Sequence, residues 1–423
     1  MILSFSNYRD KLYSCFFILL ILATTLLGYY GSVDKVSVQW LYLSLCLLFA
    51  FVFFTFKNLN LFDSFLKIHF TKFILVIILL GAFSIFFANN QQESIIAITK
   101  WLIYFFLFYS FYLFLNKYPI SFLDVSLLIS LILLLEISYS LSTLFDILNI
   151  TNFDKQYSTL LKGVTGNKNI TSAVFVIKLP FVFYVLAHSS KLYFKILSFI
   201  IASLTLILIF FLNTRSVFLG ISLSLFSLLI IIFISKFFLN SKVSLIKAFL
   251  IVLPFILSLA FFNYTTSKTP LSISNYTDAA SSNARLRYYS HAIDQMLDKP
   301  FTGIGLGNWK IVSVTYDKEN ILGYTVPYNV HNDLLEMGAE LGILGFVCYL
   351  MLFLFIFYLC LKTYFTNRKF SSQILVLLIS FLLFFVDLNI NFPTYRPSVM
   401  IMFILCLSLL STLNSSNNEK VSV

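Results

Sequence analysis

A polar stretch with an unusual histidine is the first place in this sequence where chemistry could occur. The stretch YNVHNDLLEMGAE, at 328–340, contains His331, one of four histidines in 423 residues. A neutral imidazole near pH 7 is the usual candidate for a general base. Asn332, Glu336 and Glu340 recur every four residues, so a helix would turn them to one polar face. His331 is therefore a candidate base, and a histidine that merely caps the following helix is the alternative.

Three arginines in polar segments could bind an anion. Arg215 lies in NTRS, and Arg285 and Arg287 lie in NARLR. A guanidinium is planar and permanently charged, which suits phosphate oxygens. Arg215 also begins an apolar run, where the free N–H groups of a helix start would favour the same ligand. An interfacial anchor is the alternative for Arg215.

The composition of the chain indicates that these groups lie beside a membrane. The sequence is 59% hydrophobic and 11% charged, whereas about a quarter of the residues of soluble proteins are charged. Its apolar runs are unbroken and do not alternate, which favours an all-α, polytopic membrane protein over a β-barrel. The net charge of +11 does not require nucleic acid as a partner, because membrane proteins concentrate Lys and Arg in cytoplasmic loops.

Twelve apolar stretches are long enough to cross the hydrocarbon core, which takes roughly 20 residues. Residues 1–263 would hold nine spans, 264–338 a long loop, 339–412 three more spans, and 413–423 a disordered cytoplasmic tail. The predicted spans are 12–30, 36–56, 71–88, 96–115, 122–145, 170–187, 192–212, 216–234, 245–263, 339–361, 373–390 and 397–412.

The distribution of positive charge predicts the orientation. With the N-terminus inside, the Lys-rich short loops lie inside, while the opposite loop NNQQES at 89–94 has no Lys or Arg. This distribution satisfies the positive-inside rule and predicts that both termini are cytoplasmic. The clusters GNKN (166–169) and NTRS (213–216) and the loop 264–338 then share the outer side.

The long outer loop is expected to be partly helical. Within NARLRYYSHAIDQMLDKP, Asn283 could cap a helix and Pro300 would stop it. The apolar stripe of this amphipathic helix suits the membrane surface or the helix bundle. The stripe is formed by Leu286, Tyr289, Ile293 and Met296.

Two ionisable residues lie deep in predicted spans. Glu136 and Lys178 are expected to pair between the fifth and sixth spans, because unpaired charges there are costly. A proton or ion pathway of a transporter is the other interpretation of this pair. The sequence shows no metal-ligand spacing, so neither a metal nor a cofactor is predicted.

Four segments, in this order, resemble motifs of the O-antigen ligase and O-antigen polymerase superfamily of bacterial membrane glycosyltransferases. The segments are TGNKN, NTRSVFLG, RLRYYSHAIDQMLDKPFTGIGLGNW and VHNDLLEMGAELGILG. The resemblance covers about residues 160–350. It implies a polyprenyl-diphosphate-linked glycan as donor, an acceptor hydroxyl on the periplasmic face of the inner membrane, inversion at the anomeric carbon, and no metal ion.

The resemblance also implies roles for individual residues. Arg215 and Arg285 would bind the donor diphosphate, and His331 would accept the proton of the attacking hydroxyl. Arg287 has no clear counterpart in the family. The family's Asn-Pro-Asn turn reads Asn167-Lys168-Asn169 here, which adds a cation near the donor. Asn332 and Glu340 would support the site.

The acceptor is left open by these motifs. A ligase would use lipid A-core, a polymerase another lipid-linked repeat unit, and a protein O-oligosaccharyltransferase a serine or threonine. The runs GIGLGNW and HNDLLEMGAELG favour the ligase. A secondary transporter or flippase is the alternative from another class, but related halves and broken helices at the midplane, which it would require, are not found in the sequence.

Overall fold

The structure is a computed structural model. It describes residues 2–28, 31–32, 34, 36–151, 153–239, 245–266, 279–321, 326–367 and 370–421. Within these residues there are fifteen α-helices, and the β-type pairing is limited to an isolated bridge between Phe153 and Thr266. The all-α fold predicted from the sequence is confirmed.

The helices follow one another along the whole described chain. Their bounds are α1 (Ile2–Leu22), α2 (Ser37–Phe56), α3 (Phe62–Leu66), α4 (His69–Ser84), α5 (Gln91–Lys117), α6 (Phe122–Ile150), α7 (Lys168–His188), α8 (Leu192–Leu212), α9 (Arg215–Leu239), α10 (Leu245–Thr265), α11 (Ala279–Asp298), α12 (Trp309–Asp317), α13 (Asp333–Thr366), α14 (Ser371–Leu388) and α15 (Pro397–Val421).

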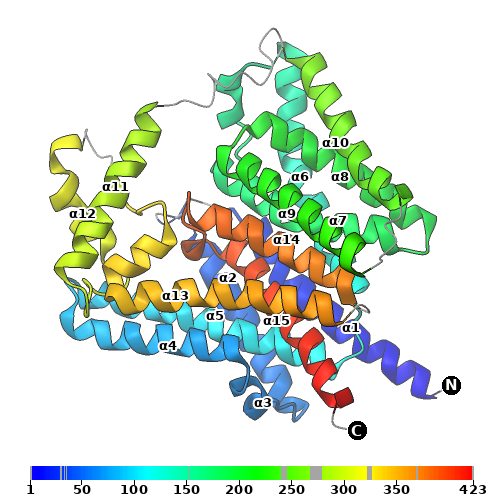
Figure 1. Cartoon of the computed structure of the whole chain (residues 1–423), viewed down its shortest axis with the longest axis horizontal. Helices are drawn as coiled ribbons and strands as arrows, with labels where there is room; N and C mark the ends of the chain where they lie inside the picture. Colours follow the sequence, from blue (N-terminus) through cyan, green and yellow to red (C-terminus); the bar gives the residue numbers. More distant parts are fainter. Residues whose placement is uncertain are drawn as a thin grey trace.

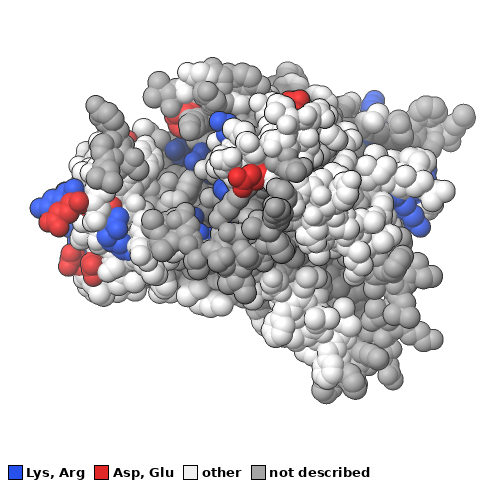
Figure 2. Space-filling view, turned by 90° about the horizontal axis from the view of Figure 1, so that it is seen from above, with Lys and Arg blue, Asp and Glu red and all other residues white. Residues whose placement is uncertain are grey.

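Two groups of helices lie side by side, and α14 joins them (Figure 1). Helices α6 to α10 form one group, and α14 packs against α7 and α9 of this group and against α13 and α15 of the other. Helices α11 and α12 lie at one end of the molecule, where α11 packs on α13. Figure 2 shows acidic and basic side chains together at one end and in the middle of this face, basic ones at the other end, and uncharged described surface between them.

Ten helices in the described part of the chain are long and apolar enough to cross a membrane, so a polytopic membrane protein is confirmed. Each of the twelve predicted spans overlaps a helix, but two of them are not among these ten. Span 12–30 falls on α1, whose first half carries the charges of Arg9, Asp10 and Lys11. Span 245–263 falls on α10, whose residues Ile251–Thr265 form an apolar segment.

The long loop is partly helical, as expected, since it holds α11 and α12. Its residues 267–278 and 322–325 lie outside the described part. The expected cap at Asn283 is wrong, because α11 already begins at Ala279, whereas the expected stop is correct, because α11 ends at Asp298 before Pro300. The tail expected to be disordered from residue 413 is helical as far as Val421, because α15 continues beyond its apolar part.

The predicted pair of Glu136 and Lys178 forms between α6 and α7. Lys178 Nζ contacts Glu136 Oε1, and Thr25 Oγ1 lies 3.4 Å from the same nitrogen. The side chains are 0% (Lys178) and 4% (Glu136) exposed, so each charge is compensated by the other inside the bundle.

Helix α13 is interrupted one turn after its polar start. Gly342 has φ 73° and ψ −171°, outside the helical region. A Cβ atom there would lie 2.4 Å from the Pro300 carbonyl oxygen, which instead accepts a hydrogen bond from the Ile343 N–H at 2.8 Å. Glycine is therefore required by both the positive φ and the close approach of the chain that follows α11.

Candidate functional site

His331 lies immediately before α13 and is held by three different elements. Its φ is 63°, a left-handed conformation that is uncommon for residues other than glycine. Its carbonyl oxygen accepts a hydrogen bond from the Tyr289 hydroxyl of α11 at 3.0 Å, and the same hydroxyl lies 3.0 Å from the Asn389 carbonyl oxygen after α14. Glu336 of α13 accepts a hydrogen bond from the Val330 N–H at 2.8 Å. The backbone around His331 is thus fixed by a contact to α11, which is distant in sequence, and by a contact to the adjoining helix α13.

The helix cap is made by Asn332 and not by His331. The Asn332 side chain accepts hydrogen bonds from the N–H groups of Leu334 and Leu335, both at 3.1 Å. This is the usual arrangement of an Asn N-cap. The capping interpretation of His331 is therefore wrong, because its imidazole does not cap α13.

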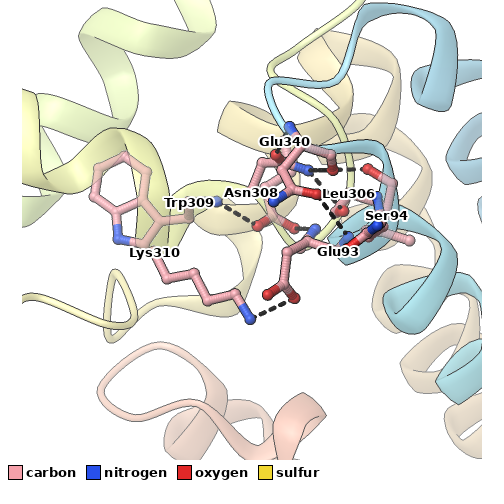
Figure 3. Close-up of polar contacts among 10 residues, drawn as sticks. Glu93, Ser94, Leu306, Asn308, Trp309, Lys310 and Glu340 are labelled. Carbon is pink, nitrogen blue, oxygen red and sulfur yellow. Dashed lines mark hydrogen bonds and ion pairs between the residues drawn. The ribbon is translucent and has the colours of Figure 1, made fainter.

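Glu340 holds the glycine-rich loop rather than the surroundings of His331 (Figure 3). Its two carboxylate oxygens accept hydrogen bonds from the N–H groups of Gly307, at 2.8 Å, and Trp309, at 2.9 Å. A Cβ atom at Gly303, whose φ is +60°, would lie 2.2 Å from the Glu340 carbonyl oxygen. Glu340 therefore supports the site by docking the GIGLGNW segment onto α13.

The same segment is tied to the start of α5 (Figure 3). The Asn308 side chain accepts a hydrogen bond from the Asn90 N–H at 2.6 Å and donates one to Ser94 at 2.9 Å. Lys310 forms an ion pair with Glu93 at 2.5 Å. The loop before α12 thus joins α5 to α13. Asn308 lies 218 positions from Asn90 and 214 positions from Ser94 in the sequence.

The His331 ring lines a cavity of about 370 Å³. The Tyr288 ring lies parallel to the imidazole with centroids 6.4 Å apart, and the Phe392 ring lies edge-on at 5.0 Å. Nδ1 of His331 is buried and has no hydrogen-bond partner among the described residues. Further polar residues that line the cavity are Asn167, Asn169, Asp387, Asn391 and Arg396.

The electrostatic surroundings keep His331 neutral. Burial lowers the pKa of His331 to about 4, and the nearby positive charge of Arg285 lowers it as well. At neutral pH the imidazole is therefore unprotonated and able to accept a proton. An anion bound at Arg285 would offset the cation and raise the pKa of His331, which would make it a stronger base.

Arg215 and Arg285 lie close together, although they come from α9 and α11. Burial lowers the pKa of Arg285, and so does the positive charge of Arg215, while Asp387 acts in the opposite direction. Arg215 donates a hydrogen bond to Ser282 of α11 at 2.8 Å. Since Arg285 also acts on His331, the structure brings the three predicted residues into one electrostatic neighbourhood, but the two arginines do not line the cavity itself.

Arg287 points elsewhere. Its Nε and Nη2 donate to the two carboxylate oxygens of Asp317 at 2.5 Å and 3.2 Å. Its guanidinium is therefore already engaged by a bidentate ion pair. The absence of a family counterpart for Arg287 agrees with this local role.

The GNKN turn begins α7 at the edge of the cavity. The Asn167 side chain caps the helix by accepting a hydrogen bond from the Asn169 N–H at 2.9 Å, and both asparagines line the cavity. Lys168 is not one of the lining residues, and its Nζ donates to Ser158 at 2.9 Å. The turn thus contributes its two asparagines to the cavity, whereas the expected additional cation is directed toward the 155–159 segment.

One known family matches the part of the chain that carries His331 and the two arginines. Residues 198–350 match the family model of O-antigen ligase. This match confirms the O-antigen ligase resemblance of the sequence. A search of curated proteins gives no match. The O-antigen ligase segment includes Arg215, Arg285 and His331, but Asn167 and Asn169 precede it, and the segment between α14 and α15 follows it.

The segment between α14 and α15 supplies site residues that sequence reasoning missed. Asp387, Asn391 and Arg396 line the cavity, and Thr394 donates from its N–H and hydroxyl groups to Asp333 at 2.9 Å and 2.5 Å. The signal in the sequence was the polar run DLNINFPTYR at 387–396, between the last two predicted spans. Under the predicted topology this turn lies on the same side as His331.

Within the described ranges, no group of three or more His, Cys, Asp or Glu residues is arranged to hold a metal ion. The acidic residues at the start of α13 are instead engaged by backbone and side-chain donors.

Proposed function

We propose that this O-antigen ligase-like protein is a membrane glycosyltransferase that moves a glycan from a polyprenyl-diphosphate donor to an acceptor hydroxyl. The observation that carries the proposal is a neutral, half-buried His331 beside Arg285, in a polar cavity at the end of the family-matched segment. A base next to a cation is the arrangement needed to deprotonate a nucleophile while an anionic group leaves.

Each predicted residue has a distinct role in this reaction. His331 accepts the proton of the acceptor hydroxyl as the hydroxyl oxygen attacks the anomeric carbon. Arg215 and Arg285 stabilise the diphosphate as it departs and gains charge, which is the electrostatic task of a metal ion in other transferases. Asn332 and Glu340 position the loops around the site, and Asn167 and Asn169 face the donor.

The location of the reaction follows from the chemistry of the donor. A polyprenyl tail stays in the lipid bilayer while its glycan lies in water, so the diphosphate is at the membrane surface. Both termini are then cytoplasmic, and the cavity faces the periplasm of a bacterial cell at its inner membrane. Nucleic acid has no part in this function.

Transfer to lipid A-core, the reaction of an O-antigen ligase, is the acceptor assignment that the motifs favour. Polymerisation onto another lipid-linked repeat unit and transfer to a protein serine or threonine use the same donor chemistry. The transporter alternative loses its main support, because Glu136 and Lys178 compensate each other inside the bundle and do not line the cavity of His331.

The proposal is tested with purified protein, a synthetic polyprenyl-diphosphate glycan and a panel of acceptors in the presence of EDTA. Transfer with inversion at the anomeric carbon is expected, and the acceptor that reacts fastest distinguishes ligase, polymerase and protein transferase. Retention of configuration, or a strict requirement for Mg²⁺, would contradict the mechanism. Absence of transfer to every acceptor, with intact donor bound, would contradict the function itself.

A further inference from the structure

Arg396, unlike Arg215 and Arg285, lines the cavity of His331, and it has no role in the reaction described above. Arg396 lies in the turn before α15, and its carbonyl oxygen accepts the N–H groups of Val399 and Met400, both at 3.0 Å. Its side chain is half-buried and faces the cavity that His331, Asn167 and Asn169 also line. The backbone of Arg396 is thus fixed, which presents its side chain from a constant position.

The guanidinium of Arg396 is held by aromatic contact and not by an acid. Its Cζ atom lies 4.9 Å from the Phe392 ring centroid, a cation–π arrangement. Nε is buried without a hydrogen-bond partner, and no ion pair of Arg396 occurs among the described residues. Asp34, the acidic residue whose charge acts on Arg396, is itself exposed to solvent.

A second cation adds to this positive charge. Lys100 of α5 repels Arg396 electrostatically, and its Nζ lies over the rings of Trp40, at 5.5 Å, and Tyr395, at 5.9 Å. Both cations are thus packed on aromatic rings, but Lys100 does not line the cavity of His331, and the negative charges of Asp34 and Glu93 act on it. Burying such charges is costly unless an anion compensates them.

The one carboxylate that also lines the cavity does not neutralise Arg396. The Asp387 carboxylate accepts a hydrogen bond from the Asn391 side chain at 2.6 Å, and the Asp387 backbone carbonyl oxygen accepts one from the Asn391 N–H at 2.7 Å. The negative charge of Asp387 instead raises the pKa of Arg285. Arg396 therefore remains available to an anion that enters the cavity.

We propose that Arg396 binds a phosphate or carboxylate group of the acceptor substrate in the cavity lined by His331. This inference rests on the proposed function for the identity of the acceptor. Phe392 contacts both Arg396 and the His331 ring, so the anion site lies one aromatic ring away from the base. In an inverting displacement the hydroxyl attacks opposite the leaving diphosphate, so the base and the acceptor share one side of the sugar.

The first experiment measures binding without catalysis. Inorganic phosphate is titrated into purified protein carrying the double change Arg215→Gln and Arg285→Gln, in which the proposed donor site is disabled. Residual phosphate binding is expected, and Arg396→Gln added to this protein should abolish it. Equal phosphate binding with and without Arg396→Gln would overturn the anion site.

The second experiment identifies the source of the anion. For an anionic acceptor, Arg396→Gln should raise the acceptor KM by about 10- to 100-fold, the size of a lost charge-assisted hydrogen bond. The KM of a neutral acceptor analogue and that of the donor should not change. An increase in the donor KM alone would overturn the assignment to the acceptor and transfer the site to the donor.

Two further variants keep the inference falsifiable. Arg287→Gln removes an arginine that already pairs with Asp317 and serves as the matched control, with no expected change in either KM. Arg396→Lys keeps the charge but not the planar fork, so it should fold even if Arg396→Gln does not and should restore part of phosphate binding. If wild-type protein binds phosphate through Arg396 but transfers no glycan, the proposed function fails while the anion site stands.

Discussion

Buried charge is treated in opposite ways in two regions of this molecule. Between α6 and α7, Lys178 and Glu136 form a closed pair with no exposure of the lysine. At the cavity, Arg285 lies near another cation and a neutral histidine, and Arg396 rests on an aromatic ring. A charge pair that compensates itself needs no ligand, whereas Arg285 and Arg396 form no ion pair within the described part of the chain, as expected of a site for an anionic substrate.

The largest effect expected from this difference is on turnover. His331→Ala should reduce glycan transfer by ~10²–10⁴-fold, because a general base contributes mainly in the transition state. Donor binding and thermal unfolding should be nearly unchanged, and both are measured on the purified protein beside Arg287→Gln as control. A His331→Ala enzyme with a near-normal rate would leave the imidazole without a catalytic role.

Changes in the Lys178–Glu136 pair should instead lower the stability of the protein. Lys178→Met should destabilise the protein by about 3–5 kcal/mol, because it leaves Glu136 buried without its partner. Adding Glu136→Leu to Lys178→Met should recover much of this loss. The measurement is unfolding in detergent together with protein abundance in the membrane. Normal abundance with abolished transfer in the single variants would show that the pair is functional, and the contrast between the two regions would disappear.

The arginines near His331 should affect the donor both before and during transfer. Arg215→Ala or Arg285→Ala should weaken donor binding by about 1.5–3 kcal/mol each, the value of hydrogen bonds to charged groups, and should lower turnover as well. Lysine at either position should restore only part of the donor binding and turnover, because its point charge cannot replace the bidentate fork of arginine. Donor Kd and kcat are compared for the Ala and Lys variants. Full recovery by Lys would mean that charge alone is required.

The smallest expected effect is a displacement of the pH profile. The kcat/KM of the free enzyme should rise with pH through the pKa of His331, about 4, and be level at neutral pH. The positive charge of Arg285 disfavours the imidazolium form and so lowers the pKa of His331. Arg285→Gln removes this charge, so the pKa should rise and the rising limb should move to higher pH. The limb of kcat should lie at higher pH than that of kcat/KM, because a bound diphosphate offsets Arg285. A profile unaffected by Arg285→Gln would separate the arginine from the base.

The spans and the family-like motifs could largely be predicted from the sequence, because both are local. An apolar run long enough to cross a bilayer stays apolar wherever its neighbours lie, and all twelve predicted spans fall on helices. The capping position shows the limit of local reasoning, since the cap was Asn332 and not the adjacent histidine. The start of α11 was misplaced for the same reason, because residues before Asn283 continue the helix.

The sequence by itself determined an all-α membrane protein with His331, Arg215 and Arg285 in family-like motifs. Only the tertiary structure decided that Arg396 and Asp387 share a cavity with His331, that Glu340 serves the glycine-rich loop, and that Lys168 does not face the cavity. The physical reason is that hydropathy and helix spacing act over neighbouring residues. Which helix ends meet depends instead on packing between α7, α13, α14 and α15, and this packing places the turn before α15 beside the base.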